Sequence, residues 1–154
     1  MNELVFLLEE ASAQAMLEGL LPKMLPTQVV PRYVVFEGKQ DLEKQLLRKI
    51  RAYNNPEARF VVLRDQDSHP DCLAVKAKLS ELCYQAGKPA TLVRIACREL
   101  ESFYLGDLAA VELGLEITGL VRQQPNKSYR EPDRLGSPAL ELRKLTKGLY
   151  QSLA

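Results

Sequence analysis

A chain of 154 residues with 46% hydrophobic residues can bury a core without disulfides or metal staples, so we expect a single domain over residues 1–154. The 21 basic and 20 acidic residues give a net charge of +1, which excludes the strongly basic composition of domains that bind polyanions over their whole surface. No apolar run approaches the roughly 20 residues that cross a bilayer, and the N-terminus lacks a basic signal region. We therefore expect a cytoplasmic protein without membrane contact.

The first predicted elements alternate between strands and helices. Residues 4–8 are an unbroken apolar run, which is typical of a strand covered on both faces. After Ser12, a predicted helix cap, apolar residues recur at helical spacing until Pro22, where we expect the helix to end or kink. Residues 33–36 follow Pro31 and predict a second strand.

Residues 41–53 predict a helix with a basic outer face. Its basic residues are Lys44, Arg48, Lys49 and Arg51. A face of this kind is more often a solvated surface than a track for phosphates. Residues 60–63 predict the third strand, a third helix is expected to end at Gly87, and residues 91–95 predict the fourth strand.

This alternation predicts an α/β fold, a Rossmann-like three-layer sandwich with a mostly parallel sheet of about four strands and helices on both faces. We expect that core to span residues 1–96 and a helical C-terminal extension to span residues 97–154. Within the extension, two short helical patterns precede a polar loop over 123–136, and a last helix is predicted to begin at Ser137 and Pro138.

Acidic residues follow three of the four predicted strands. They are Glu9 and Glu10 after the first, Asp65 and Asp67 after the third, and Glu99 and Glu101 after the fourth. Ligands of open parallel sheets bind outside the carboxyl ends of the strands, so we expect these carboxylates to converge there. Carboxylates that lie so close together repel each other unless a cation or raised pKa values offset the repulsion.

A divalent metal ion would resolve this repulsion. If the backbone is extended, Asp65 and Asp67 point the same way at roughly 6 to 7 Å, a span that hard cations can bridge. Mg²⁺ or Mn²⁺ fits best, with Asp65, Asp67 and Glu9 as predicted ligands. Acidic residues after strands also cap helices or solvate loops, which is the alternative interpretation. Arg94 and Arg98 are candidates for contacting a substrate phosphate, or for pairing with the nearby glutamates.

These motifs resemble a known family. The order of strand and glutamate, then strand and Asp-x-Asp, is similar to the Toprim domain of topoisomerases, primases and overcoming-lysogenization-defect nucleases. More specifically, residues 6–10 (FLLEE), 62–68 (VLRDQDS) and 94–107 (RIACRELESFYLGD) resemble the DUF4276 family. The resemblance extends to residues 132–138 (PDRLGSP) and so covers most of the chain.

The resemblance implies a Toprim-like metal site. Glu9 would match the Toprim glutamate, which serves as general acid/base or metal ligand, and Asp65 and Asp67 would match its metal-binding pair. That glutamate is usually followed by glycine, and Glu10 stands there in this chain, so both Glu9 and Glu10 are candidates for the catalytic acid. The additional candidates Glu99, Glu101 and Asp107 belong to the motif of the smaller family.

Three functions follow as hypotheses. The first is a metal-dependent phosphodiesterase acting on nucleic acid, an effector in a phage-defence or mobile-element system; the resemblance implies a partner ATPase. The second is a non-catalytic interaction module that docks an ATPase. The third is an aspartyl-phosphate phosphatase, although the Asp-x-Asp of such enzymes normally follows the first strand.

Overall fold

The computed structural model describes residues 2–151, which divide into two compact units. The first unit comprises residues 2–64 and 69–95, and the second comprises residues 65–68 and 96–151. The turn that follows the third strand therefore belongs to the second unit, together with everything after the fourth strand. That the whole chain forms a single domain stays a prediction.

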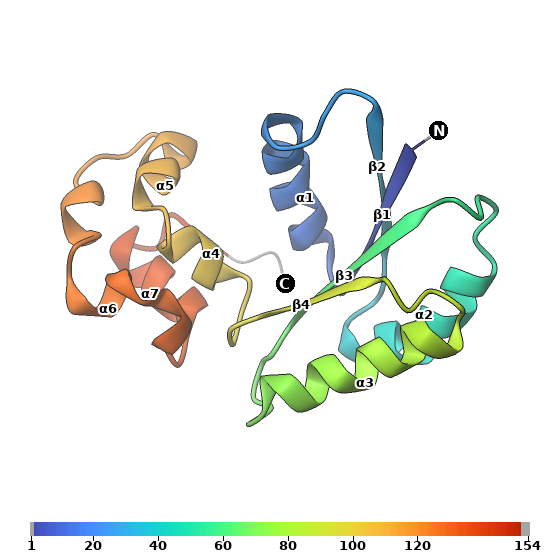
Figure 1. Cartoon of the computed structure of the whole chain (residues 1–154). Coiled ribbons are helices and arrows are strands. Elements are labelled where there is room, and N and C mark those ends of the chain that lie inside the picture. Colours follow the sequence, from blue (N-terminus) through green and yellow to red (C-terminus); the bar gives the residue numbers. More distant parts are fainter. Residues whose placement is uncertain (1, 152–154) are drawn as a thin grey trace. The chain divides into compact units, whose positions relative to one another are not determined.

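Strands and helices alternate in the first part of the chain (Figure 1). The elements are β1 (Asn2–Leu8), α1 (Ala11–Leu20), η1 (Leu21–Lys23), β2 (Val29–Val35), α2 (Lys39–Arg51), β3 (Arg59–Asp65), α3 (Cys72–Gln85) and β4 (Leu92–Ala96). The strands form one sheet in the order β2-β1-β3-β4, and all of them run parallel. The predicted α/β class and the parallel sheet of four strands are confirmed.

The central position of β1 explains its unbroken apolar sequence. Leu8 pairs with Val35 of β2 on one side and with Leu63 of β3 on the other, so neither edge of β1 meets solvent. Helix α1 lies on one face of the sheet, and α2 and α3 lie on the other (Figure 1). Apolar side chains are therefore needed on both faces of β1, and alternation is lost.

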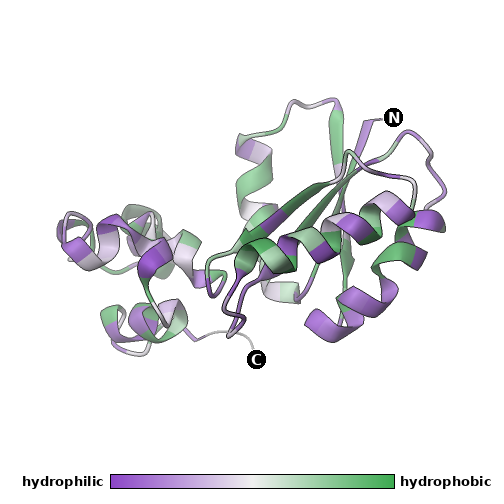
Figure 2. Ribbon diagram, turned by 60° about the horizontal axis from the view of Figure 1, so that its bottom comes forward, coloured by the Kyte–Doolittle hydropathy of each residue, from purple (hydrophilic) through white to green (hydrophobic). Residues whose placement is uncertain are grey.

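The main core of the first unit lies between the sheet and the helices α2 and α3. Val5 and Leu7 of β1 are buried in it, together with Leu42, Leu46 and Ile50 of α2. Helix α3 adds Val75, Leu79 and Cys83, at helical spacing. Figure 2 shows hydrophobic stretches on these helices and strands interleaved with hydrophilic ones, the pattern expected of amphipathic helices packed on a sheet.

Some predicted boundaries are wrong. Strand β2 begins at Val29, so Pro31 lies inside it. Proline has no N–H to donate, and an edge strand tolerates this because one of its sides has no neighbouring strand to bond with. Helix α1 begins at Ala11 with Glu10 as its N-cap, so Ser12 lies within the helix and does not cap it. As predicted, α1 ends just before Pro22, which lies in a short 3-10 turn.

The second unit is helical. It contains α4 (Glu101–Leu105), α5 (Leu108–Leu115), η2 (Val121–Gln123), α6 (Lys127–Arg130), η3 (Pro132–Arg134) and α7 (Pro138–Leu145). Its core is formed by Leu105, Leu108, Val111, Leu120 and Leu142. Residues 123–136, predicted to be a loop, contain short helical turns, which are too brief to show apolar periodicity. The predicted start of the last helix, with Ser137 as N-cap and Pro138 in its first turn, is confirmed.

Across residues 2–151, each helix is either too short or too polar to span a lipid bilayer.

Candidate functional site

The turn after β3 is joined to the segment after β4 by backbone hydrogen bonds within the second unit. The N–H of Gln66 donates to the carbonyl of Ala96 at 3.0 Å, and the N–H of Asp67 donates to the carbonyl of Arg98 at 2.6 Å. The buried side chain of Gln66 accepts a further bond, of 3.2 Å, from the N–H of Arg98. These contacts hold the Asp-x-Asp segment beside the segment that carries Glu99.

The two segments share a backbone conformation that is uncommon outside glycine. Asp67 has φ of 55° and Arg98 has φ of 63°, both in the left-handed region. Aspartate visits this region more readily than most residues, whereas an arginine there costs on the order of 1 kcal/mol. Strained residues of this kind persist only where their surroundings hold them, and they cluster at functional sites.

The expected extended geometry of Asp65 and Asp67 is wrong. Strand β3 ends at Asp65, and the chain turns through the left-handed Asp67 immediately afterwards. The predicted spacing of two side chains on one face of a strand therefore does not apply to them. Both residues nevertheless belong to the second unit, where Glu99 and Glu101 also lie.

Glu101 and Asp67 lie close enough to Glu99 to act on it electrostatically. Burial raises the pKa of Glu99, and the negative charges of Glu101 and Asp67 raise it further, while the N–H of Ala139 lowers it. Desolvation and nearby like charge both disfavour the ionised form of a carboxyl group, which is the effect expected where acidic groups lie close together. We call Asp65, Asp67, Glu99 and Glu101 the acidic cluster.

A tyrosine from the far end of the chain binds the acidic cluster. The hydroxyl of Tyr150 donates a hydrogen bond of 2.7 Å to Oε1 of Glu101, whose side chain is buried at the start of α4. Burial raises the pKa of Tyr150 well above its usual range, and the hydrogen bond to Glu101 and the charges of Glu101, Tyr104 and Asp65 add to the shift. The ring packs against that of Tyr104, with the centroids 6.0 Å apart.

Sequence reasoning missed both tyrosines. Tyr150 stands 49 residues from Glu101, and no local pattern connects the two positions. Their raised pKa values favour the neutral phenols, which add no negative charge beside Glu101, and the phenol of Tyr150 also donates a hydrogen bond to it.

Other predicted site residues have different surroundings. Glu9 is buried in the first unit, where its carbonyl accepts a bond of 3.0 Å from the N–H of Gly38, and Glu10 is exposed at the N-cap of α1. That Glu9 or Glu10 joins the acidic cluster stays a prediction. Asp107 caps α5, because its Oδ1 accepts a bond of 3.1 Å from the N–H of Ala110.

The two arginines that we predicted to contact phosphate differ in their surroundings. Arg94 is exposed on the edge strand β4, and its guanidinium donates to the carbonyl of Val93 at 3.0 Å. Arg98 is half-buried in the second unit, and its guanidinium lies 3.5 Å from the carbonyl of Asp67. Arg98 is therefore the one that the structure brings to the Asp-x-Asp segment.

The residue before Asp65 is held by an ion-pair network in the first unit. Arg64 is buried at the end of β3 and pairs through Nη1 with Oε1 of Glu43 on α2. Lys78 of α3 binds the other oxygen of Glu43 at 2.7 Å. The network ties the end of β3 to both helices on that face of the sheet.

Whether a metal ion fits the acidic cluster depends on how many carboxylates have to bind it at once. Within residues 2–151, no three side chains of His, Cys, Asp or Glu are arranged to hold one ion together. Mg²⁺ commonly keeps several waters and takes only one or two carboxylates from the protein. The acidic cluster supplies oxygen ligands only, and burial, followed by the negative charges of Glu101 and Asp67, raises the pKa of Glu99. A metal ion at the cluster would therefore have to be held by one or two carboxylates and by water, and metal binding stays a prediction.

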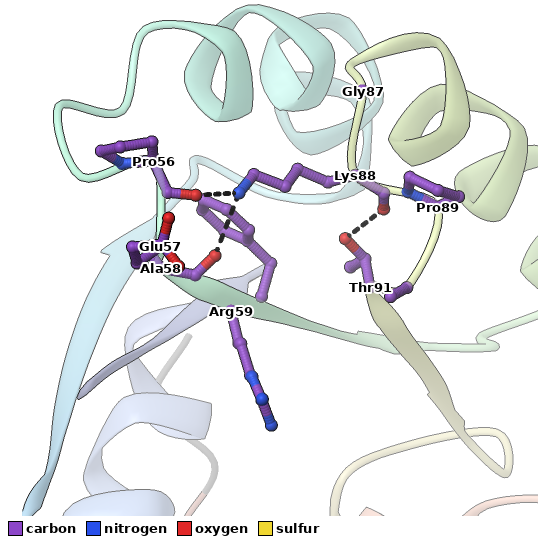
Figure 3. A pocket seen from close by; sticks show the side chains of 10 residues that line it. Pro56, Glu57, Ala58, Arg59, Gly87, Lys88, Pro89 and Thr91 are labelled. Carbon is purple, nitrogen blue, oxygen red and sulfur yellow. Dashed lines mark hydrogen bonds between the residues drawn. The ribbon is translucent and has the colours of Figure 1, made fainter.

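The first unit has a hollow at the N-terminal ends of β3 and β4. A cavity of about 470 Å³ lies between residues 56–60 and 87–91 (Figure 3). Figure 3 shows the side chain of Lys88 reaching across it to the carbonyls of Pro56 and Ala58. The ammonium also lies 5.6 Å from the centroid of the Phe60 ring. The cation of Lys88 is therefore already engaged by carbonyls and an aromatic ring of this loop region.

Comparison of the chain with protein-family models, with curated proteins and with solved structures finds no match. The resemblance to the Toprim domain and to the DUF4276 family therefore rests on the motifs quoted above and stays a prediction.

Proposed function

We propose that this protein is a metal-dependent phosphodiesterase that acts on nucleic acid. The observation that carries the proposal is the acidic cluster, in which burial and the charges of Glu101 and Asp67 raise the pKa of Glu99. A divalent cation would relieve this repulsion, and such ions also polarise phosphate groups during hydrolysis. The resemblance to Toprim nucleases supports the same conclusion.

In this proposal the residues have separate roles. Asp65 and Asp67 would hold Mg²⁺ or Mn²⁺. Glu99 and Glu101 would add negative charge beside the ion, as direct ligands or through bound water. Bound there, the metal would withdraw charge from a phosphate and lower the pKa of an attacking water. Arg98 would neutralise a phosphate oxygen beside the Asp-x-Asp segment. The assignment of proton transfer to Glu9 or Glu10 rests on the Toprim resemblance.

Metal-dependent cleavage tests the proposal. Purified protein is incubated with plasmid DNA and with single-stranded DNA and RNA, with Mg²⁺, with Mn²⁺ or with EDTA. We expect cleavage with a divalent ion only, and a loss of about 100-fold or more in Asp65→Asn, as for removal of a group that stabilises the transition state. Asp133→Asn, an exposed aspartate of the same unit, is the matched control. Cleavage that survives Asp65→Asn and EDTA rejects the assignment.

A second function is favoured by a different observation. The hydroxyl of Tyr150 already binds Glu101, and Asp107 already caps a helix, so part of the acidic motif serves the structure of the second unit. A non-catalytic module that docks a partner ATPase would need only this structural role. It predicts that Mn²⁺ produces no heat of binding in calorimetry and that an ATPase co-purifies. Hydrolysis of p-nitrophenyl phosphate without nucleic-acid cleavage would instead indicate a phosphatase.

A further inference from the structure

Helix α2 carries a basic stripe on the side that faces away from the core. The stripe consists of Lys44, Arg48 and Arg51, which are all exposed. At positions i, i+4 and i+7 they lie on one side of the helix and span about 10 Å along its axis. The opposite side, formed by Leu42, Leu46 and Ile50, is buried against the sheet.

The acidic residues of α2 do not neutralise this basic stripe. Oδ2 of Asp41 accepts a hydrogen bond of 3.0 Å from the N–H of Glu37. Glu43 is occupied by Arg64 and Lys78. Among residues 2–151, no carboxylate forms an ion pair with Lys44, Arg48 or Arg51; Arg51 donates to the carbonyl of Gln85 at 2.8 Å.

The helix dipole explains only part of this pattern. Arg48 and Arg51 stand in the last turn of α2, where cations stabilise the partial negative charge of the helix end. Lys44 stands in the middle of the helix, beyond the reach of that effect. Three like charges on one face otherwise repel each other, at a cost of a few tenths of a kcal/mol per pair.

We infer that the basic stripe is a contact surface for the phosphate backbone of nucleic acid. Exposed cations spaced along about 10 Å can each neutralise a phosphate of a backbone that passes over the helix. An anionic membrane is disfavoured, because helices that lie on membranes need a free apolar face, and that of α2 is buried in the core. With a net charge of only +1, the chain needs such a local patch to bind a polyanion.

The inference rests on the proposed function for its choice of nucleic acid, but it concerns binding and not cleavage. It is therefore tested in EDTA, which removes divalent ions and so prevents metal-dependent cleavage. The triple variant Lys44→Gln, Arg48→Gln and Arg51→Gln is compared with a control triple variant, Arg122→Gln, Lys127→Gln and Arg130→Gln. The control changes the net charge equally, at exposed residues of the second unit.

The measurement is the fluorescence anisotropy of a labelled DNA duplex between about 50 and 200 mM salt. We expect the α2 variant to bind about 10-fold or more weakly at low salt, and its slope of log K against log salt to fall by about 2 to 3. The control should match the parent chain. The single variant Lys44→Gln, which leaves the last turn of α2 intact, should lower the slope by about 1.

Three results would overturn the inference. One is an α2 variant with unchanged affinity and salt slope. Another is a control variant that loses as much affinity as the α2 variant. The third is binding to vesicles rich in phosphatidylserine in place of DNA. The proposed catalysis can be rejected independently of this inference. If DNA binding depends on the basic stripe but no cleavage occurs, the phosphodiesterase proposal is rejected and the contact surface is still supported.

Discussion

Oε1 of Glu101 accepts a hydrogen bond of 2.7 Å from the hydroxyl of Tyr150, which joins the end of the described chain to the first turn of α4. Removing the hydroxyl with Tyr150→Phe leaves a buried carboxylate without this donor and keeps the ring that packs on Tyr104. We expect the free energy of unfolding to fall by about 2 kcal/mol, as for a hydrogen bond to a charged group. Urea unfolding measures it. Tyr84→Phe, at an exposed tyrosine, is the control and should change nothing.

The ionisation of Glu99 should make the protein less stable at neutral pH. Burial raises its pKa, and the charges of Glu101 and Asp67 add to the shift. The folded state then binds the proton of Glu99 more tightly than the unfolded state does, so protonation of Glu99 stabilises the folded protein. This stabilisation is fully present below the ordinary carboxyl pKa. It is lost as the pH rises through the raised folded pKa.

Glu99→Gln should therefore stabilise the protein at pH 7, by about 0.5 kcal/mol once solvent screening is allowed for, and should have no stabilising effect near pH 4. Thermal unfolding of both chains across this range, in EDTA, measures the difference. Glu57→Gln, at an exposed glutamate, is the control. A variant that is equally destabilised at both pH values would contradict the electrostatic explanation.

Glu43→Gln should destabilise the first unit strongly, because it leaves the guanidinium of buried Arg64 beside a neutral amide. The expected loss is about 3 kcal/mol at pH 7. Lys78→Gln removes the second, largely exposed partner and should cost less than about 1 kcal/mol. Equal losses in the two variants would contradict this ranking of the two ion pairs.

The effect of Glu43→Gln should shrink in acid. Burial acts to raise the pKa of Glu43, but the hydrogen bonds from Lys78 and Arg64 outweigh it and lower the pKa. A lowered folded pKa gives stability that is present above the ordinary carboxyl pKa and is lost as the pH falls through the folded value. Urea unfolding at pH 7 and near pH 3 should therefore give a smaller difference between parent and variant in acid.

Gln124 should be essential to the fold of the second unit. Its Nε2 donates to the carbonyls of Leu105 and Tyr129, both at 2.9 Å, and its Oε1 accepts from the N–H of Leu108 at 2.7 Å. Gln124→Leu removes all three bonds and should lower the free energy of unfolding by about 2 to 3 kcal/mol. Hydrogen exchange at Leu108 should report the same loss. Gln123→Leu, at a neighbouring glutamine that accepts a side-chain bond from Asn126, should cost far less.

The α/β fold was predictable because its signals are local. The apolar runs at 4–8 and 60–63 are typical of buried strands, and the helical spacing of Leu42, Leu46 and Ile50 indicates which side of α2 faces the sheet. The position of acidic residues after these strands was also readable, because it depends on chain order alone. The charge of Asp67 acts on Glu99 because of that order and because backbone hydrogen bonds join their two segments.

The local sequence therefore determined the order of the main strands and helices, the parallel sheet and the list of acidic candidates, but not every boundary or the short helical turns of the second unit. Only the tertiary structure decided how those acids are used. It placed Asp67 in the left-handed region, bound Glu101 to Tyr150 and paired Glu43 with Arg64. The physical reason is that hydrogen bonds and charges act through space over a few ångströms, whereas periodicity and turn chemistry act only between near neighbours in the chain.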